Sequence, residues 1–187
     1  MSSDNKLAIY PLEFDYKLKN PDKFLASLVR TGFVSDSATS GDNKKRFLPG
    51  EKFMRHLTFL GCSPSVGPGT ADKSFNNYFI ELLTSNKNPG LIASPRLRPP
   101  ECPGCGNRDI DGRAHQQIRI NQASPAWHCL ECGQNYAVTE INWRYKLAVA
   151  TDYIVVHGVF EGEAIPSDKF LDQLAGESGI SWTYCYC

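Results

Sequence analysis

The chain has 187 residues, of which 41% are hydrophobic and 21% are charged, a composition typical of a folded globular protein and not of a disordered one. A chain of this length can bury a hydrophobic core without relying on a metal for the whole fold. Lys and Arg together number 20, as do Asp and Glu, so the net charge gives no indication of a nucleic-acid partner.

A secretory signal has a basic start followed by a long apolar run, and the N-terminal residues 1–20 lack this pattern. The sequence also contains no stretch of about 18 apolar residues, so we expect no membrane span. Seven cysteines without an export signal indicate a reducing compartment, where paired cysteines bind metal more often than they form disulfides. We therefore expect a cytoplasmic protein.

The first elements follow from periodicity and capping signals. Residues 7–16 predict a strand, because aromatic and β-branched residues partly alternate there. Residues 20–32 predict a helix, with Asn20 as its cap and Pro21 at the first helical position. Residues 35–46 are small and polar and predict a loop.

The middle of the chain is less regular. Residues 55–61 predict a strand, and residues 63–74 predict a second loop. Residues 75–83 fit both a helical and a strand pattern, and their aromatic and β-branched residues favour a strand. The Pro-rich segment 94–100 is stiff and predicts a hinge into a separate module that extends to about Asn142.

The C-terminal part predicts two further strand regions and a helix. Residues 145–162 predict one long strand or a hairpin, and residues 165–179 predict a helix capped by Ser167. Residues 181–187 predict a closing strand. Residues 147–187 contain one basic residue against six acidic ones, so this part is acidic and the remainder is basic.

The two helical segments resemble each other, which bears on the fold. Residues 21–33 and 166–180 both contain Asp-Lys-Phe-Leu after a proline, a weak internal repeat that chance could also produce. A strand–helix–strand order that occurs twice predicts an α+β protein with a ferredoxin-like, split βαβ sandwich. Residues 1–93 and 144–187 would form its two halves, and residues 94–143 would be inserted between them.

Four cysteines carry the strongest signal. They form two Cys-x-x-Cys-Gly turns, Cys102 to Cys105 and Cys129 to Cys132, separated by 23 residues. Each turn directs two thiolates to one point, and the glycine that follows permits a positive φ. The motifs resemble the zinc-ribbon family over about residues 100–142. The resemblance implies a small hairpin module that holds Zn²⁺ with four cysteines.

A closed set of four thiolates leaves no coordination position for water, so we expect a structural ion and not a catalytic one. A rubredoxin-like iron site uses similar turns, and the sequence alone does not separate the two metals. His115 and His128 could replace a cysteine, but four thiolates already satisfy the metal. Residues 115–120 and 135–143 predict the strands of the ribbon.

Cations and one aromatic ring surround the module. Candidate contacts for nucleic acid or a protein partner are Arg96, Arg98, Arg108, Arg113, Arg119 and Trp127, with Arg144 and Lys146 close by in the sequence. Acidic residues in the same segment leave only a small positive balance, which is weak for a surface that follows phosphates. A near-neutral surface with Trp and Arg also suits a protein interface.

Other reactive residues give weaker signals. Cys62, His56 and His157 are candidates for an enzyme site, but the sequence supplies no partner for any of them. Cys185 and Cys187 alternate on one predicted strand and would point to the same face. Burial as small side chains explains them as well as metal or redox chemistry does.

These observations favour a non-enzymatic, zinc-binding interaction module, an accessory or assembly subunit of a larger complex. A protein partner is expected, contacted by the ribbon and by the acidic C-terminal part. The first alternative is a nucleic-acid-binding subunit that uses the basic residues around the ribbon. The second is an enzyme with a site near Cys62, His56 or His157.

Overall fold

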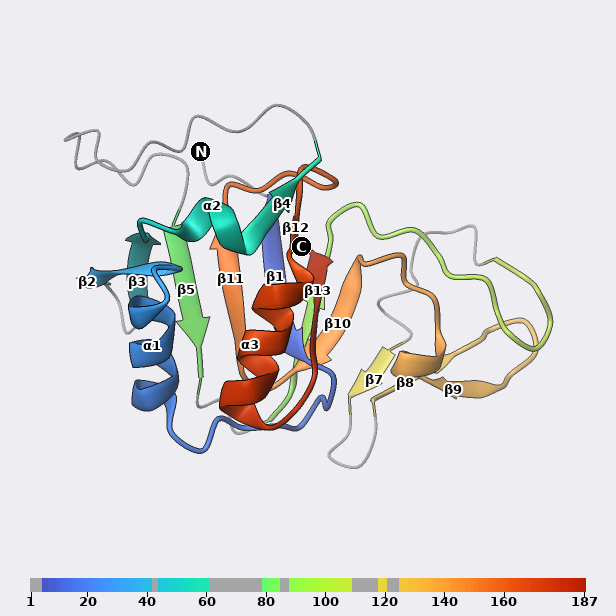
Figure 1. Ribbon diagram of the computed structural model, residues 1–187. Helices are drawn as coiled ribbons and strands as arrows, with labels where there is room; N and C mark the ends of the chain where they lie inside the picture. Colours follow the sequence, from blue (N-terminus) through green and yellow to red (C-terminus); the bar gives the residue numbers. More distant parts are fainter. Residues whose placement is uncertain (1–4, 42–43, 61–78, 85–87, 109–117, 121–124) are drawn as a thin grey trace.

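A computed structural model describes residues 5–41, 44–60, 79–84, 88–108, 118–120 and 125–187. The described part is a mixed α/β structure, with many strands and few helices. None of the helices in these residues has the length and apolar character needed to cross a membrane. Figure 1 shows a larger α/β part, which contains the C-terminal strand, and a smaller part built from β7, β8 and β9.

The larger part contains a central sheet of six strands, in which every neighbouring pair is antiparallel. In spatial order the strands are β13 (Trp182–Tyr186), β1 (Lys6–Pro11), β11 (Tyr153–His157), β5 (Phe79–Leu83), β3 (Lys44–Pro49) and β2 (Val34–Gly41). The strands β1 and β5 therefore run in the same direction with β11 between them. In the same way, β11 and β13 run in the same direction with β1 between them.

Two helices cover one face of this sheet (Figure 1). They are α1 (Pro21–Arg30) and α3 (Asp168–Ser178), and both helix predictions are confirmed. The side chain of Asn20 accepts a hydrogen bond from the amide of Lys23, and Ser167 caps α3 in the same way. Gly179 ends α3 with φ 81°, the left-handed conformation that glycine adopts without steric cost.

The main hydrophobic core lies between these helices and the sheet. Phe24 on α1 stacks on Trp182 of β13, with ring centroids 5.4 Å apart, and Phe33 contacts Phe170 of α3 at 4.4 Å. Fully burying one such side chain contributes about 1.5–3 kcal/mol. This core stabilises the larger part through apolar burial.

One loop prediction and two strand predictions need correction. Residues 35–46 are not a loop, because β2 and β3 pair there as the edge of the sheet. The strand predicted over residues 7–16 ends at Pro11. Of residues 55–61, the first two end the short helix α2 (Phe53–His56), and only β4 (Leu57–Phe59) is a strand, paired with β12 (Ala164–Pro166). Residues 63–74 lie outside the described residues.

Residues 145–162 are neither one strand nor a hairpin. They contain β10 (Leu147–Ala150) and β11, which belong to different sheets. Between them, the buried carboxylate of Asp152 accepts a hydrogen bond from the amide of Leu18 at 2.7 Å. This contact stabilises the turn at which the chain passes from the sheet of β10 into the central sheet.

β10 pairs with β6 (Gly90–Ala93), and we call this two-stranded sheet the stalk. One face of the stalk packs on the side of the central sheet that α1 and α3 leave open, through Ile92, Ala148 and Ala150 against Ala8 and Cys185. The segment between β6 and β10 forms the smaller part. The stalk therefore connects the two parts and lies between them.

The smaller part, which we call the ribbon, contains a three-stranded antiparallel sheet. Its strands are β7 (Ile118–Ile120), β8 (Pro125–His128) and β9 (Asn135–Ala137). The strand predicted over residues 135–143 stops after β9, and a 3₁₀ turn, η2 (Val138–Glu140), follows. Leu147 and Val149 of the stalk belong to the same hydrophobic core as the ribbon.

Candidate metal centre

The two cysteine turns have the same backbone structure. In the first, the amide of Cys102 donates to the carbonyl of Asn107 at 2.9 Å, and the amide of Gly106 donates to the carbonyl of Cys102 at 2.9 Å. The second turn repeats both bonds at the same distance, from Cys129 to Gln134 and from Gly133 to Cys129. Each turn therefore folds back on its own first cysteine.

The glycine after each turn is required by its conformation. Gly106 has φ 68° and Gly133 has φ 70°, both in the left-handed region that disfavours other residues. This conformation lets the turn close so that its amides reach the first sulfur. Backbone N–H groups of Gly104 and Cys105 donate to Cys102, and two equivalent groups donate to the first sulfur of the second turn.

The four sulfur atoms converge on one point. Cys102 Sγ lies 3.7 Å from Cys132 Sγ, and Cys105 Sγ lies 3.8 Å from Cys129 Sγ. All four lie within 4.8 Å of one another and form no disulfide. A tetrahedron of sulfurs about 2.3 Å from a central Zn²⁺ has edges of about 3.8 Å. The two shortest separations match this edge, so the donor set fits a tetrahedral metal.

The cysteine thiols differ in pKa, which affects metal binding because the thiolate is the form that binds a metal. Burial raises the pKa of the Cys102 thiol, but hydrogen bonds from Cys105 and Gly104 amides and from the Tyr136 hydroxyl lower it to about 6. Burial raises the pKa of Cys129, and neighbouring sulfurs add to this effect. A divalent cation among the sulfurs would remove their mutual repulsion and stabilise all four thiolates.

The sequence did not identify Tyr136 as a residue of the site. It lies on β9, and its hydroxyl donates to the sulfur of Cys102 while resting against Gly104. A Cβ atom at position 104 would collide with this hydroxyl. Side chains alternate between the two faces of a strand, and only this alternation along the predicted strand could have indicated that Tyr136 faces the cysteines.

Trp127, a predicted contact residue, lies in the core of the ribbon and not at the surface. It is 1% exposed and lies between Tyr136 and Trp143, with both ring centroids 6.3 Å away. The strand pairing explains this position, because Trp127 on β8 lies opposite Ile118 and Tyr136 on its two neighbours. Its ring can stack on neither a base nor a partner without opening the ribbon.

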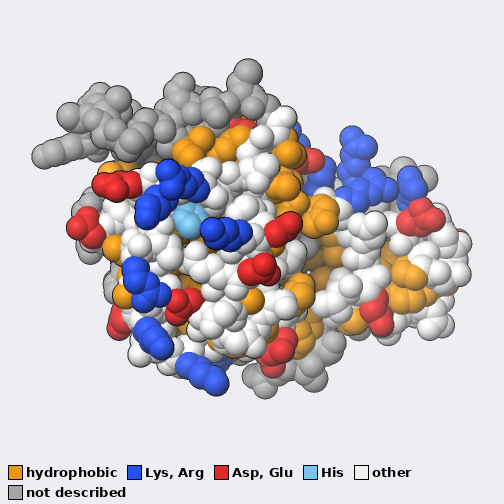
Figure 2. Space-filling view, viewed as in Figure 1, with side chains coloured by type: hydrophobic (Ala, Val, Ile, Leu, Met, Phe, Trp, Pro, Cys, Tyr) orange, Lys and Arg blue, Asp and Glu red, His pale blue; other side chains and the backbone are white. Residues whose placement is uncertain are grey.

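The predicted arginine contacts occupy different environments. Arg108 forms an exposed ion pair with Glu101 at 2.7 Å. Arg96 lines a small hollow beside the end of the central sheet, and Arg98 lines another at the junction of ribbon and stalk. Arg113 lies outside the described residues, and Arg119 lies on β7. Figure 2 shows Lys and Arg side chains gathered on the upper side of the ribbon end.

The candidate enzyme residues do not come together. His56 contacts Phe33 and Phe170 on the helix side of the sheet, and its Nε2 lies 3.0 Å from the carbonyl of Thr31. His157 lies on β11, next to Val156, whose side chain faces the helices, so the His157 side chain points to the opposite face. Cys62 lies outside the described residues.

His157 instead belongs to a charged group that the sequence did not indicate. Its Nε2 lies 3.0 Å from Oε2 of Glu81, whose Oε1 accepts from Nε of Arg46 at 3.0 Å. The rings of His157 and Phe79 stack at 3.8 Å. Because these residues come from β3, β5 and β11, the group ties three neighbouring strands together.

Cys185 and Cys187 point to the same face, as predicted, and meet the stalk there. Cys185 is fully buried with Ala8 and Ala148, and Cys187 packs against the same cluster. Burial raises the pKa of both thiols, so they are poor nucleophiles. Within the described ranges, the only group of three or more His, Cys, Asp or Glu arranged for a metal is Cys102, Cys105, Cys129 and Cys132.

Comparison with known proteins adds no relative. No protein-family model matches the chain, and searches of curated proteins and of solved structures found no match either.

Proposed function

We propose that Cys102, Cys105, Cys129 and Cys132 hold one structural Zn²⁺ in a zinc ribbon. The observation that carries this proposal is the convergence of the four sulfurs, with two separations of 3.7 and 3.8 Å. Four thiolates also fill a tetrahedral site, so no position stays open for water or substrate. A tetrahedral four-sulfur site accepts iron as well, and metal analysis separates the two ions.

The larger part is proposed to be a ferredoxin-like sandwich. In support, β1–α1–β5 and β11–α3–β13 are strand–helix–strand units whose parallel strands are each separated by a strand of the other unit. That interleaving is what a split βαβ arrangement requires. The hairpin of β2 and β3 extends the sheet beyond β5. On this view residues 1–93 and 144–187 form one domain, interrupted by residues 94–143.

The protein is proposed to act as a non-enzymatic interaction module in a reducing, cytoplasmic setting, as an accessory or assembly subunit. The closed set of four thiolates, which leaves no coordination position for a substrate, supports this, as does the separation of His56 from His157 on opposite faces of the sheet. Leu130, at the tip of the second cysteine turn, is 68% exposed, and an exposed apolar residue on a rigid turn suits contact with a protein partner.

There are two alternatives to an interaction module, a nucleic-acid-binding protein and an enzyme. A nucleic-acid-binding role has support from the cations Arg98, Arg144 and Lys146 at the base of the ribbon. The burial of Trp127 and the pairing of Arg108 with Glu101 weaken that role. An enzyme would need a site near His56, His157 or Cys62. His56 and His157 lie on opposite faces of the central sheet, so this alternative ranks last.

The test is a native pull-down of the full chain, with and without nuclease, combined with metal analysis. Leu130→Asp should abolish capture of the partner and keep one zinc per chain. Leu48→Asp is the matched control, because Leu48 is 44% exposed on β3, away from the ribbon. A partner that both variants retain, or that nuclease removes, would contradict the protein-docking proposal, and the second result would favour nucleic acid.

A further inference from the structure

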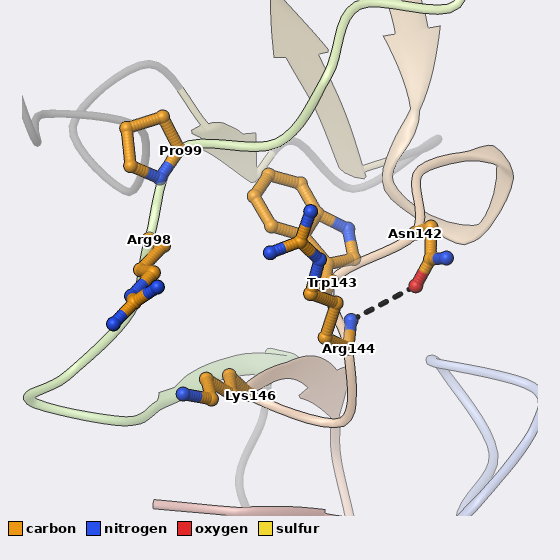
Figure 3. A pocket seen from close by; sticks show the side chains of 6 residues that line it. All are labelled: Arg98, Pro99, Asn142, Trp143, Arg144 and Lys146. Atoms are coloured by element: carbon orange, nitrogen blue, oxygen red, sulfur yellow. Dashed lines mark hydrogen bonds between the residues drawn. The ribbon is translucent and has the colours of Figure 1, made fainter. Parts of the chain in front are cut away.

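A small cavity of about 70 Å³ lies where the ribbon joins the stalk. Figure 3 shows the six residues that line it, which come from two facing segments. One segment leads from β6 into the ribbon and the other leads from the ribbon into β10. The lining residues are Arg98, Pro99, Asn142, Trp143, Arg144 and Lys146.

The lining of this cavity is strongly cationic. Three of its six residues are Lys or Arg, and none is acidic. Lys146 is largely buried and reaches Glu161 at 2.8 Å, whereas the ion pairs found among described residues include neither Arg98 nor Arg144. The positive charges of Arg98 and Arg144 favour an anion at this hollow. These two charges are therefore available to bind an anionic ligand.

The backbone of this segment is unusual in a second way. Arg144 has φ 53° and Tyr145 has φ 58°, and they are the only non-glycine residues with positive φ in the described part of the chain. Such a conformation costs free energy and persists only when its surroundings enforce it. A glycine would adopt it freely, so the arginine side chain is present at a position where the backbone disfavours it.

Several hydrogen bonds enforce this conformation. Asn142 Oδ1 accepts from the amide of Arg144 at 3.0 Å, and the Trp143 indole donates to the carbonyl of Val138 at 2.7 Å. On the far side, the carbonyl of Tyr145 accepts from the amide of Tyr186 in β13 at 2.7 Å. Contacts to the ribbon and to the central sheet thus hold the backbone at Arg144 and Tyr145 in place.

The size of the cavity limits what it can hold. Since one water needs about 10–15 Å³ measured in the same way, the hollow has room for roughly five heavy atoms. A tetrahedral phosphate has that size, and arginine pairs bind its oxygens through charge-assisted, bidentate hydrogen bonds. The small positive balance of the surrounding segment suits one phosphate better than a strand of many.

We propose that Arg98, Arg144 and Lys146 form a binding site for a single phosphate group carried by a small phosphorylated ligand. The cavity exists only when the ribbon is folded, so this inference rests on the metal-held ribbon proposed above. Metal content, measured separately on each variant, distinguishes failure of the site from failure of the ribbon.

The experiment is an isothermal calorimetric titration of the zinc-loaded full chain with inorganic phosphate at constant ionic strength. We expect saturable binding that Arg98→Gln and Arg144→Gln each weaken about tenfold or more, because each removes a charge-assisted hydrogen bond. Arg55→Gln removes the same charge from an exposed position on α2 and should change affinity less than twofold. Zinc should stay at one per chain in all three variants.

A second set of probes identifies the carrier of the phosphate. A nucleoside monophosphate should bind and the nucleoside should not, and an oligonucleotide should bind only with a terminal phosphate. Three results would overturn the proposal: no saturable phosphate binding, an equal loss in Arg55→Gln, or tight, salt-sensitive binding of an oligonucleotide without terminal phosphate. The last result would indicate a surface that follows the nucleic-acid backbone.

Discussion

Leu147 and Ala148 are consecutive residues of β10, but their side chains pack into different cores. Leu147 lies in the ribbon core with Trp127 and Cys129, whereas Ala148 lies between the stalk and the central sheet. The strand β10 is therefore buried on both faces. The stalk couples the ribbon, with its four clustered cysteines, to the α/β part through packed side chains.

This coupling predicts that the stalk stabilises the ribbon. Leu147→Ala should lower the free energy of unfolding by about 2–5 kcal/mol, because it leaves a cavity in the ribbon core. Leu91→Ala is the matched control on β6, where the side chain is 37% exposed, and should cost less than about 1 kcal/mol. Urea unfolding of the zinc-loaded proteins, followed by tryptophan fluorescence, measures both. Equal losses would show that the two parts are not coupled through Leu147.

The contact between Tyr136 and the first cysteine turn predicts an effect on metal affinity. Tyr136→Phe removes the hydroxyl that donates to Cys102, and Gly104→Ala displaces it by collision. Each change should weaken zinc binding roughly 10–100-fold, as expected for a group that supports a metal ligand. Because both act through one hydroxyl, the double variant should be no weaker than the weaker single variant.

Competition with a coloured chelator measures these affinities. Gly176→Ala is the control, since a Cβ there meets nothing within 4 Å, and Gly176 lies inside α3. It should leave zinc affinity unchanged and add about 0.5–1 kcal/mol of stability, because alanine favours a helix interior. Fully additive losses in the double variant would mean that Tyr136 and Gly104 act independently.

The positive φ of Arg144 predicts opposite effects on stability and binding. Arg144→Gly should relieve the backbone strain and raise the free energy of unfolding by about 0.5–1 kcal/mol, after the entropic cost of glycine is subtracted. The same variant should lose phosphate binding. Arg144→Gln removes the guanidinium but keeps the strain, so it should lose binding with no gain in stability. A less stable glycine variant would contradict the inference of strain.

Local signals explain what the sequence could predict. The helices α1 and α3 were predictable because their caps, Asn20 and Ser167, and their apolar faces lie within a few residues of each other. The four cysteines were predictable for the same reason, since each turn is a complete local motif. The strands β2 and β3 were missed because their polar residues lack the apolar alternation that marks a half-buried strand.

What the sequence could not provide depends on contacts between distant residues. The turn at Asp152 has no Gly or Pro signal and is stabilised by the amide of Leu18. The burial of Trp127 follows from strands on both sides of it. The cavity joins Arg98 to Arg144 only because β6 pairs with β10. No local pattern encodes these pairings.

The buried His157 predicts a pH dependence of stability. Burial lowers its pKa, and this outweighs the opposing effect of Glu81, so the folded state binds fewer protons than the unfolded state. Stability should therefore fall as pH drops below about 6.5, where the unfolded histidine begins to take up a proton. Burial also lowers the pKa of His56, which adds to the same trend.

His157→Gln should reduce this loss of stability, because glutamine can donate to Glu81 but does not titrate. Urea unfolding of the wild-type protein and the variant at pH 7.5 and pH 6.0, with zinc saturating throughout, isolates the contribution of His157. If both proteins lost the same stability between the two pH values, His157 would not be its source.

The most direct test of a structural zinc is the metal content of the purified chain, measured by native mass spectrometry together with elemental analysis. We expect one zinc per chain in the wild-type protein and in Cys187→Ser, and none in Cys102→Ser or Cys132→Ser. Loss of zinc should also unfold the ribbon and expose Trp127 to solvent. A chain that contains iron, or that keeps a folded ribbon without any metal, would contradict the claim that a structural zinc holds the ribbon together.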